Sequence, residues 1–299
     1  GRNFCSKIWN AFRLIKGWTV DDNIQASDAA KLAVHWFESK QNEVAAEVAD
    51  LFSKYRLSEA LMAVYKLFWD EFSSWYLEMI KPAYGQGIDR TTYDATLCFL
   101  DNLLHLLHPF MPFITEELWQ QMYERNAEEG ESLMVSALSM DTYVDTAFVA
   151  QFEVVKGVIS NIRSIRLQKN IAQKEPLDLQ VLGENPVAEF NAVIQKMCNL
   201  SSITVVESKA EGASSFMVGT TEYAVPLGNM IDVEAEIARM EAELKHKEGF
   251  LQGVLKKLSN EKFINNAPAA VLEMERKKQA DAESIISSLK ESIAALKKA

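Results

Sequence analysis

The chain has 299 residues, of which 48% are hydrophobic and 24% charged, and its formal net charge is −11. This composition is that of a globular protein of two or three domains, and it excludes a single small module and a mainly disordered chain. No apolar run reaches about 18 residues, and no signal-peptide segment opens the chain, so the sequence favours a cytoplasmic protein with no membrane partner. Cys5, Cys98 and Cys198 are too few and too far apart for a disulfide framework or a metal knuckle.

The negative charge is concentrated in the first half of the chain. Residues 1–145 contain 12 basic and 22 acidic residues, residues 146–228 contain 7 and 8, and residues 229–299 contain 12 and 12. A net negative charge taken alone argues against nucleic-acid binding, but two of these three segments are nearly neutral and all three contain local basic clusters. A helical pattern begins at residue 2 without an initiator Met, so we expect the chain to be part of a longer protein.

Residues 1–145 are predicted to form a bundle of four or five helices. Phe4, Ile8 and Ile15 recur at the spacing of one helical face. Similar apolar stripes cover residues 27–50, 58–81 and 91–107. Thr115 is predicted to cap a fifth helix that runs to about Tyr123.

Residues 146–228 are predicted to form a small α+β domain. Its expected elements are a helix at about 148–169, a strand at 177–182, a helix at about 186–199, and strands at 203–206 and 222–225. Residues 229–299 carry two heptad stripes, and the asparagines and proline between them indicate a turn. Residues 232–298 should therefore form an antiparallel coiled-coil hairpin, an arm about 40 Å long. Its seam positions are Ile237, Leu244, Leu251 and Leu258 in the first helix and Leu272, Ala282, Leu289 and Leu296 in the second. The fold class is mainly α.

Three basic clusters are the candidate binding sites. The first lies in residues 1–16, which contain no acid, and consists of Arg2, Asn3, Lys7, Trp9, Asn10 and Arg13. Cations, amides and one aromatic on a helix suit single-stranded nucleic acid, although the same pattern fits a solvated helix whose tryptophan packs on a neighbour. The second cluster consists of Arg163, Arg166 and Lys169, in which the two arginines at i, i+3 are placed to clamp one phosphate, or else mark a solvated helix end. The third lies on the arm and consists of Lys256, Lys257, Lys262, Arg276, Lys277 and Lys278.

The usual signatures of catalysis and of metal binding do not occur in the sequence. Phosphate-binding glycine loops, the HExxH pattern and the GxSxG pattern are missing. His105 and His108 lie three residues apart, but no cysteine is near them, and Glu116 and Glu117 face different sides of a helix. We therefore predict no catalytic residue, no metal and no cofactor in this chain.

Two segments resemble a known family. The run RNFCSKIWNA at 2–11, followed by Arg13, resembles the opening helix of the anticodon-binding bundle in class I aminoacyl-tRNA synthetases of the valine type. The run HPFMPFITEELW at 108–119 resembles the second signature of that bundle. The isoleucine and leucine enzymes share both motifs. The segment LSNEKFI at 258–264, with Ala267-Pro268 and the run ERKK at 275–278, resembles the C-terminal coiled coil of the valine type.

The resemblance covers essentially the whole chain and implies the C-terminal, tRNA-binding portion of a valine–tRNA ligase. Its partner would be a valine-accepting tRNA, with no DNA and no membrane, and the chain would act as a monomer. ATP and magnesium would serve the full-length enzyme, in domains that this chain does not include. Two alternatives stay open: a coiled-coil scaffold for protein interactions, and the equivalent region of an isoleucine- or leucine-type synthetase.

Overall fold

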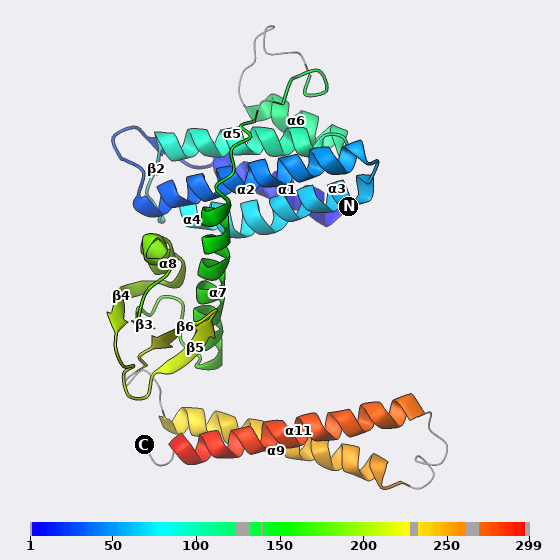
Figure 1. Cartoon of the computed structure of the whole chain (residues 1–299), viewed down its shortest axis with the longest axis vertical. Helices are drawn as coiled ribbons and strands as arrows, with labels where there is room; N and C mark the ends of the chain where they lie inside the picture. The colour runs from blue at the N-terminus through cyan, green and yellow to red at the C-terminus, as the bar shows by residue number, and fades with distance from the viewer. Residues whose placement is uncertain (1, 123–131, 139, 228–232, 261–268, 297–299) are drawn as a thin grey trace. The chain divides into compact units, whose positions relative to one another are not determined.

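The structure is a computed structural model that describes residues 2–122, 132–138, 140–227, 233–260 and 269–296 (Figure 1). Its contacts divide the chain into two compact units, Gly1–Leu167 with Ala172–Pro226, and Gln168–Ile171 with Leu227–Ala299. The first unit holds the helical bundle together with the small α+β module. The expected division into three domains, at 145/146 and 228/229, stays a prediction.

The bundle has the predicted helices, and its core is largely aromatic. Its helical elements are α1 (Arg2–Lys16), α2 (Asp28–Ser53), α3 (Leu57–Lys66), the π-helix η1 (Leu67–Tyr76), α4 (Leu77–Ile80), α5 (Arg90–Leu107) and α6 (Pro112–Met122). Two short parallel strands, β1 (Val20–Asp21) and β2 (Ile88–Asp89), join the loops that precede α2 and α5. The ring of Phe37, which is fully buried, lies 5.2 Å from the rings of Phe72 and Phe99 and 4.9 Å from that of Tyr76.

The stripe at 58–81 was expected to be one helix, but its middle ten residues form the π-helix η1. Phe68, Phe72 and Tyr76 follow one another at intervals of four residues and form a continuous row of ring contacts, with ring centroids 5.5 and 5.6 Å apart. In the wider turn of a π-helix, residues four apart stay on one face, so these three rings all enter the core. The apolar pattern of the sequence predicted the buried face but not this change of pitch.

The fifth helix begins earlier than predicted. Helix α6 starts at Pro112, because proline suits the first position of a helix, where no backbone N–H is required. The carbonyl oxygen of Met111 accepts from the backbone N–H of Thr115 at 3.3 Å, so Thr115 lies inside the helix. The prediction that Thr115 caps it was wrong. The buried Thr115 hydroxyl instead donates to that same carbonyl oxygen at 2.9 Å. The expected helix end at Tyr123 lies outside the described residues.

The α+β module contains one strand that the sequence pattern missed. Its elements are α7 (Thr146–Gln168), β3 (Leu177–Leu182), the short helix η3 (Ala188–Phe190), α8 (Asn191–Cys198), β4 (Leu200–Val206), β5 (Ser214–Val218) and β6 (Thr221–Val225). The sheet order is β4-β3-β6-β5, with β3 and β4 parallel and the other pairs antiparallel. Helix α7 extends from the bundle along this sheet (Figure 1), and a Cβ on Gly157 would lie 3.0 Å from Val218 on β5. The sequence SSFMV of the unpredicted strand β5 does not alternate between apolar and polar residues, which is why the pattern missed it.

The arm is an antiparallel helical hairpin, as predicted. Its helices are α9 (Val233–Leu258) and α11 (Ala269–Leu296), and ion pairs join Lys257 to Glu275 at 3.9 Å and Lys290 to Glu248 at 2.9 Å. The side chains of Val254, Ala282, Ile286 and Ile293 are buried. The placement of the Ile237 and Leu296 side chains is not described. Within the ranges given above, no helix is long and apolar enough to span a membrane.

Candidate nucleic-acid interface

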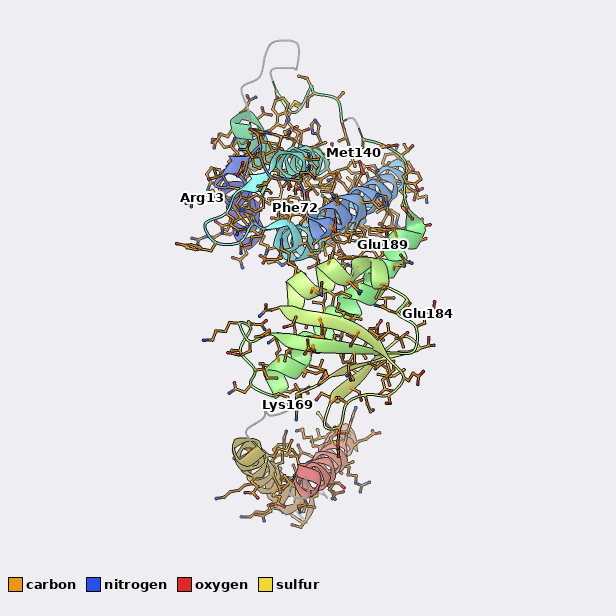
Figure 2. The ribbon with its side chains drawn as sticks, turned by 90° about the vertical axis from the view of Figure 1, so that its left-hand side faces the viewer. Arg13, Phe72, Met140, Lys169, Glu184 and Glu189 are labelled. Carbon is orange, nitrogen blue, oxygen red and sulfur yellow. The ribbon has the colours of Figure 1, made fainter. Side chains whose placement is uncertain are left out.

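Helix α1 has one buried face and one exposed basic ridge. Phe4, Ile8 and Ile15 are buried in the bundle, while Arg2 and Arg13 are exposed on the opposite side. Together with Ser6, these two arginines form what we call the α1 ridge. Figure 2 shows Arg13 at the surface of the bundle and Phe72 inside it. Because α1 contains no acidic residue, the ridge is locally basic on an otherwise acidic bundle.

An open hollow lies on the side of the ridge that faces α6. It has a volume of about 400 Å³ and is lined by Cys5, Ser6, Trp9, Asn10 and Ile114. Trp9 is half-buried, and its ring lies 6.4 Å from that of Phe12. The ring is therefore partly packed, as the alternative interpretation expected, and partly open to solvent.

A smaller pocket lies on the other side of the ridge, and we call it the η1-side pocket. It has a volume of about 160 Å³ and is lined by Lys7, Asn10, Ala11, Leu14, Ser73, Leu77 and Glu78. The Lys7 ammonium lies 5.1 Å from the ring centroid of Trp69 on η1, a cation–π contact. Asn10 lines both the hollow and the pocket, and Asn3 is exposed nearby on the same helix.

Three residues that line these two hollows, Ser73, Glu78 and Ile114, were not predicted from the sequence. Ser73 and Glu78 lie in the stripe that was expected to be one regular helix, and Ile114 directly precedes the residue that was predicted to cap the fifth helix. Their proximity to α1 depends on tertiary packing, which no local spacing encodes.

The structure corrects the phosphate clamp predicted from Arg163 and Arg166. Arg163 is exposed, and its guanidinium lies 5.5 Å from the ring centroid of Trp75. Arg166 is only 1% exposed and donates hydrogen bonds to three backbone carbonyl groups. A buried arginine that binds carbonyl oxygens cannot share a phosphate with an exposed one. Lys169 is half-buried near the end of α7.

Most of the cations that were predicted to bind on the arm lie close together, near the end of α9 and on the facing part of α11. Lys256 and Lys257 near the end of α9 lie opposite the exposed run Arg276, Lys277 and Lys278 on α11, as the Lys257–Glu275 pair shows. Glu275 also pairs with Lys278 at 2.7 Å, so one carboxylate offsets charge on two of these lysines. For Lys256, Arg276 and Lys277 the described residues provide no ion pair. Lys262 lies outside the described residues.

His105 on α5 and His108, the residue directly after this helix, are engaged in local hydrogen bonds. His105 lies 2.9 Å from the carbonyl oxygen of Asp101 and 2.8 Å from the Ser136 hydroxyl, and His108 lies 2.8 Å from the Thr115 hydroxyl. Across the described part of the chain, no group of three or more His, Cys, Asp or Glu side chains is placed to hold a metal ion.

Comparison with known families defines the class of protein. Residues 34–181 match the family described as the anticodon-binding domain of tRNA ligase, and residues 232–297 match the valyl tRNA synthetase tRNA binding arm. The first match covers most of the bundle and reaches β3, and the second covers the hairpin. The chain is therefore of the aminoacyl-tRNA ligase class.

Whole-chain relatives narrow this class. The chain is 72% identical over 298 residues to the valine–tRNA ligase of Phocaeicola vulgatus, 70% to that of Bacteroides fragilis and, over 312 residues, 35% to that of Enterococcus faecalis. These alignments include 99% or 100% of this chain but only 34% or 35% of each relative. The chain belongs to the valine–tRNA ligase family and spans about a third of the length of these relatives.

Proposed function

We propose that this chain holds the tRNA for a valine–tRNA ligase, with the bundle at the anticodon and the arm on another part of the tRNA. The observation that carries the proposal is the α1 ridge, where two exposed arginines stand between two hollows. Single-stranded RNA is bound by cations that hold its phosphates and by aromatic or polar surfaces that receive unstacked bases. The ridge and its flanking hollows supply both features on one helix.

The arm provides contacts of a different kind. Lys256, Arg276 and Lys277 are exposed point charges on a helical hairpin. Contacts of this type bind phosphate without reading sequence. Under this proposal, the arm adds affinity for any tRNA and the bundle selects among tRNAs.

The full ligase would join valine to a valine-accepting tRNA with ATP and Mg²⁺. We assign that chemistry to parts of the ligase other than this chain, whose own residues would bind and orient the tRNA. We further propose that the protein works in the cytoplasm as a monomer and binds neither DNA nor membranes.

The test compares two charge-matched double variants for binding to valine-accepting tRNA. Lys7→Ala/Arg13→Ala removes one cation of the ridge and one from the η1-side pocket beside it, and we expect binding to weaken by about 1–3 kcal/mol in total. Lys31→Ala/Arg56→Ala removes the same charge from α2 and the α2–α3 connection, where both cations pair with neighbouring acids. Equal affinity of the two folded variants would contradict the proposal.

A further inference from the structure

Residues 132–138, which follow α6 in the chain and which we call the 132–138 loop, are fastened to that helix. One carboxylate oxygen of Glu116 on α6 accepts hydrogen bonds from the Ser132 hydroxyl at 2.9 Å and from the backbone N–H of Leu133 at 3.0 Å. The Leu133 side chain is only 3% exposed. Within the loop, the Ser136 hydroxyl donates to the carbonyl oxygen of Leu133 at 3.0 Å. These hydrogen bonds fix the course of the loop backbone beside α6.

The loop nevertheless presents apolar side chains to solvent. Met134 and Val135 are 74% and 73% exposed, and Leu138 is 42% exposed. Phe113, which lies one helical turn before Glu116 on α6, is 91% exposed. We call these four apolar residues the Met134 patch. Single exposed apolar side chains are ordinary, but a group of them on an ordered backbone marks an interaction site, and methionine adapts well to a partner surface.

The surroundings of the patch are acidic, and this restricts its partner. Residues 108–145 contain eight acidic residues and one basic residue. Burial opposes the ionisation of Glu116, but hydrogen bonds from Gln120, Ser132 and Leu133 keep the pKa of this carboxyl below its usual value. The negative charge repels RNA phosphates, and it also repels a second copy that presents the same patch. A protein surface that is apolar at its centre and basic at its rim is complementary to it.

The small size of the patch indicates that this partner belongs to the same polypeptide. Separate proteins in a standard complex each bury roughly 800 Å², which is more than four side chains provide. A segment of the same polypeptide acts at a high effective concentration, so that a smaller contact suffices. This chain matches only 34% of the length of the Phocaeicola vulgatus ligase, so most of such a ligase lies outside the segment that the chain represents.

We propose that the Met134 patch docks onto a part of the ligase outside residues 1–299, through an apolar surface with a basic rim. The 132–138 loop and the start of α6 are then the side of the bundle that faces the rest of the ligase. The contact fixes how the bundle is held within the enzyme. This inference goes beyond the tRNA-binding proposal and does not depend on it, because it concerns only contacts between parts of the protein.

The experiment measures the oxidation of Met134 by hydrogen peroxide, followed by mass spectrometry, in this chain and in the full-length ligase that contains it, both without tRNA. Peroxide converts accessible methionines to sulfoxides. If docking lowers the exposed fraction of Met134 from 74% to about 10%, its oxidation should be about sevenfold slower in the full-length ligase. Met217 on β5, which is 57% exposed, is the internal reference and should be oxidised at the same rate in both proteins.

Two variants of the full-length ligase show whether the patch itself makes the contact. Val135→Glu places a charge in the apolar contact, and it should return the oxidation of Met134 to the rate in the isolated chain. Val205→Glu is the matched control, because Val205 on β4 is also exposed, at 60%, but lies outside the patch. With this control, Met134 should stay protected. Both valines are exposed, so neither change should prevent folding.

Three results would overturn the proposal. The first is equal oxidation of Met134 in the unaltered chain and the unaltered ligase. The second is protection that arises only after tRNA is added, because RNA would then cover the patch. The third is protection that depends on the concentration of the isolated chain, because a second copy would then cover it. The tRNA-binding proposal is tested separately by the variants of the α1 ridge, so either proposal can fail without the other.

Discussion

Arg166 on α7 donates a hydrogen bond of 2.8 Å to the carbonyl oxygen of Cys198, the last residue of α8. The same guanidinium bonds to the carbonyl oxygens of Ala172 at 2.8 Å and Asn199 at 3.3 Å. The last carbonyl groups of a helix have no partner within it, and they carry the negative end of the helix dipole. Arg166 therefore caps α8 from a neighbouring helix, and burial lowers the pKa of its guanidinium.

Replacing Arg166 should destabilise the first unit. Arg166→Met keeps a long side chain but leaves buried carbonyl groups unsatisfied, and we expect a loss of about 2–4 kcal/mol in the free energy of unfolding. Arg163→Ala removes an exposed arginine three residues earlier and should cost less than about 1 kcal/mol. Urea unfolding of both variants measures the difference, and similar losses would show that the cap contributes little.

The thiol of Cys198 should be protected from chemical modification. Burial raises its pKa to about 12, although Arg163 and Arg166 nearby favour the thiolate. At pH 8 the thiol is neutral as well as buried, and only the thiolate reacts with iodoacetamide. The pKa of the Cys98 thiol is also raised by partial burial, but this residue is exposed, so mass spectrometry should find Cys98 alkylated in the native chain and Cys198 alkylated only in urea.

The raised pKa of Cys198 also predicts how stability depends on pH. The unfolded thiol ionises near pH 9 and the folded one at about pH 12, so the unfolded chain loses its proton first. This contribution to stability is complete below pH 9 and falls as the pH rises towards 12. Cys198→Ala should remove that part of the alkaline slope, and an unchanged slope would contradict the assignment.

The local pattern of the sequence predicted α1, the mainly α fold and the hairpin, because each depends on apolar residues at helical or heptad spacing. The prediction that Arg166 binds phosphate also relied on local spacing alone, and it was wrong. The spacing of Arg166 from Arg163 places both on one face of an isolated helix, but in the fold only Arg166 is buried, where it bonds to the end of α8. The η1-side pocket depends on the packing of α1 against a π-helix, which has no signature in the apolar pattern. Contacts between distant segments therefore account for what the sequence could not predict.

Removing the arm should leave the first unit folded. The contacts of the chain place residues 227–299, together with 168–171, in a unit separate from the bundle and the sheet, and all six tryptophans lie before residue 120. Tryptophan fluorescence therefore reports only on the first unit. A chain that ends at residue 227 should show the same urea midpoint as the full chain. A shift of the midpoint to lower urea would mean that the arm stabilises the bundle.

The exposed cations of the arm should add affinity for tRNA without adding specificity. Each lysine or arginine that contacts a phosphate releases counterions, so the loss of one contact should flatten the slope of log affinity against log salt by about 0.7–0.9 units. Arg276→Ala/Lys277→Ala should therefore weaken binding of valine-accepting and other tRNAs about equally. The slope should flatten by up to twice the amount expected for one lost contact.

Two further variants separate direct phosphate contacts from the general charge of the arm. Lys278→Ala should have a smaller effect on the slope than Lys277→Ala, because Glu275 already holds the Lys278 ammonium at 2.7 Å. Lys245→Ala/Lys247→Ala removes two charges from the middle of α9, away from the cluster, and should leave the slope almost unchanged. If this control flattens the slope as much as Arg276→Ala/Lys277→Ala does, the arm attracts RNA through its overall charge. The prediction that Arg276 and Lys277 contact phosphates directly would then be wrong.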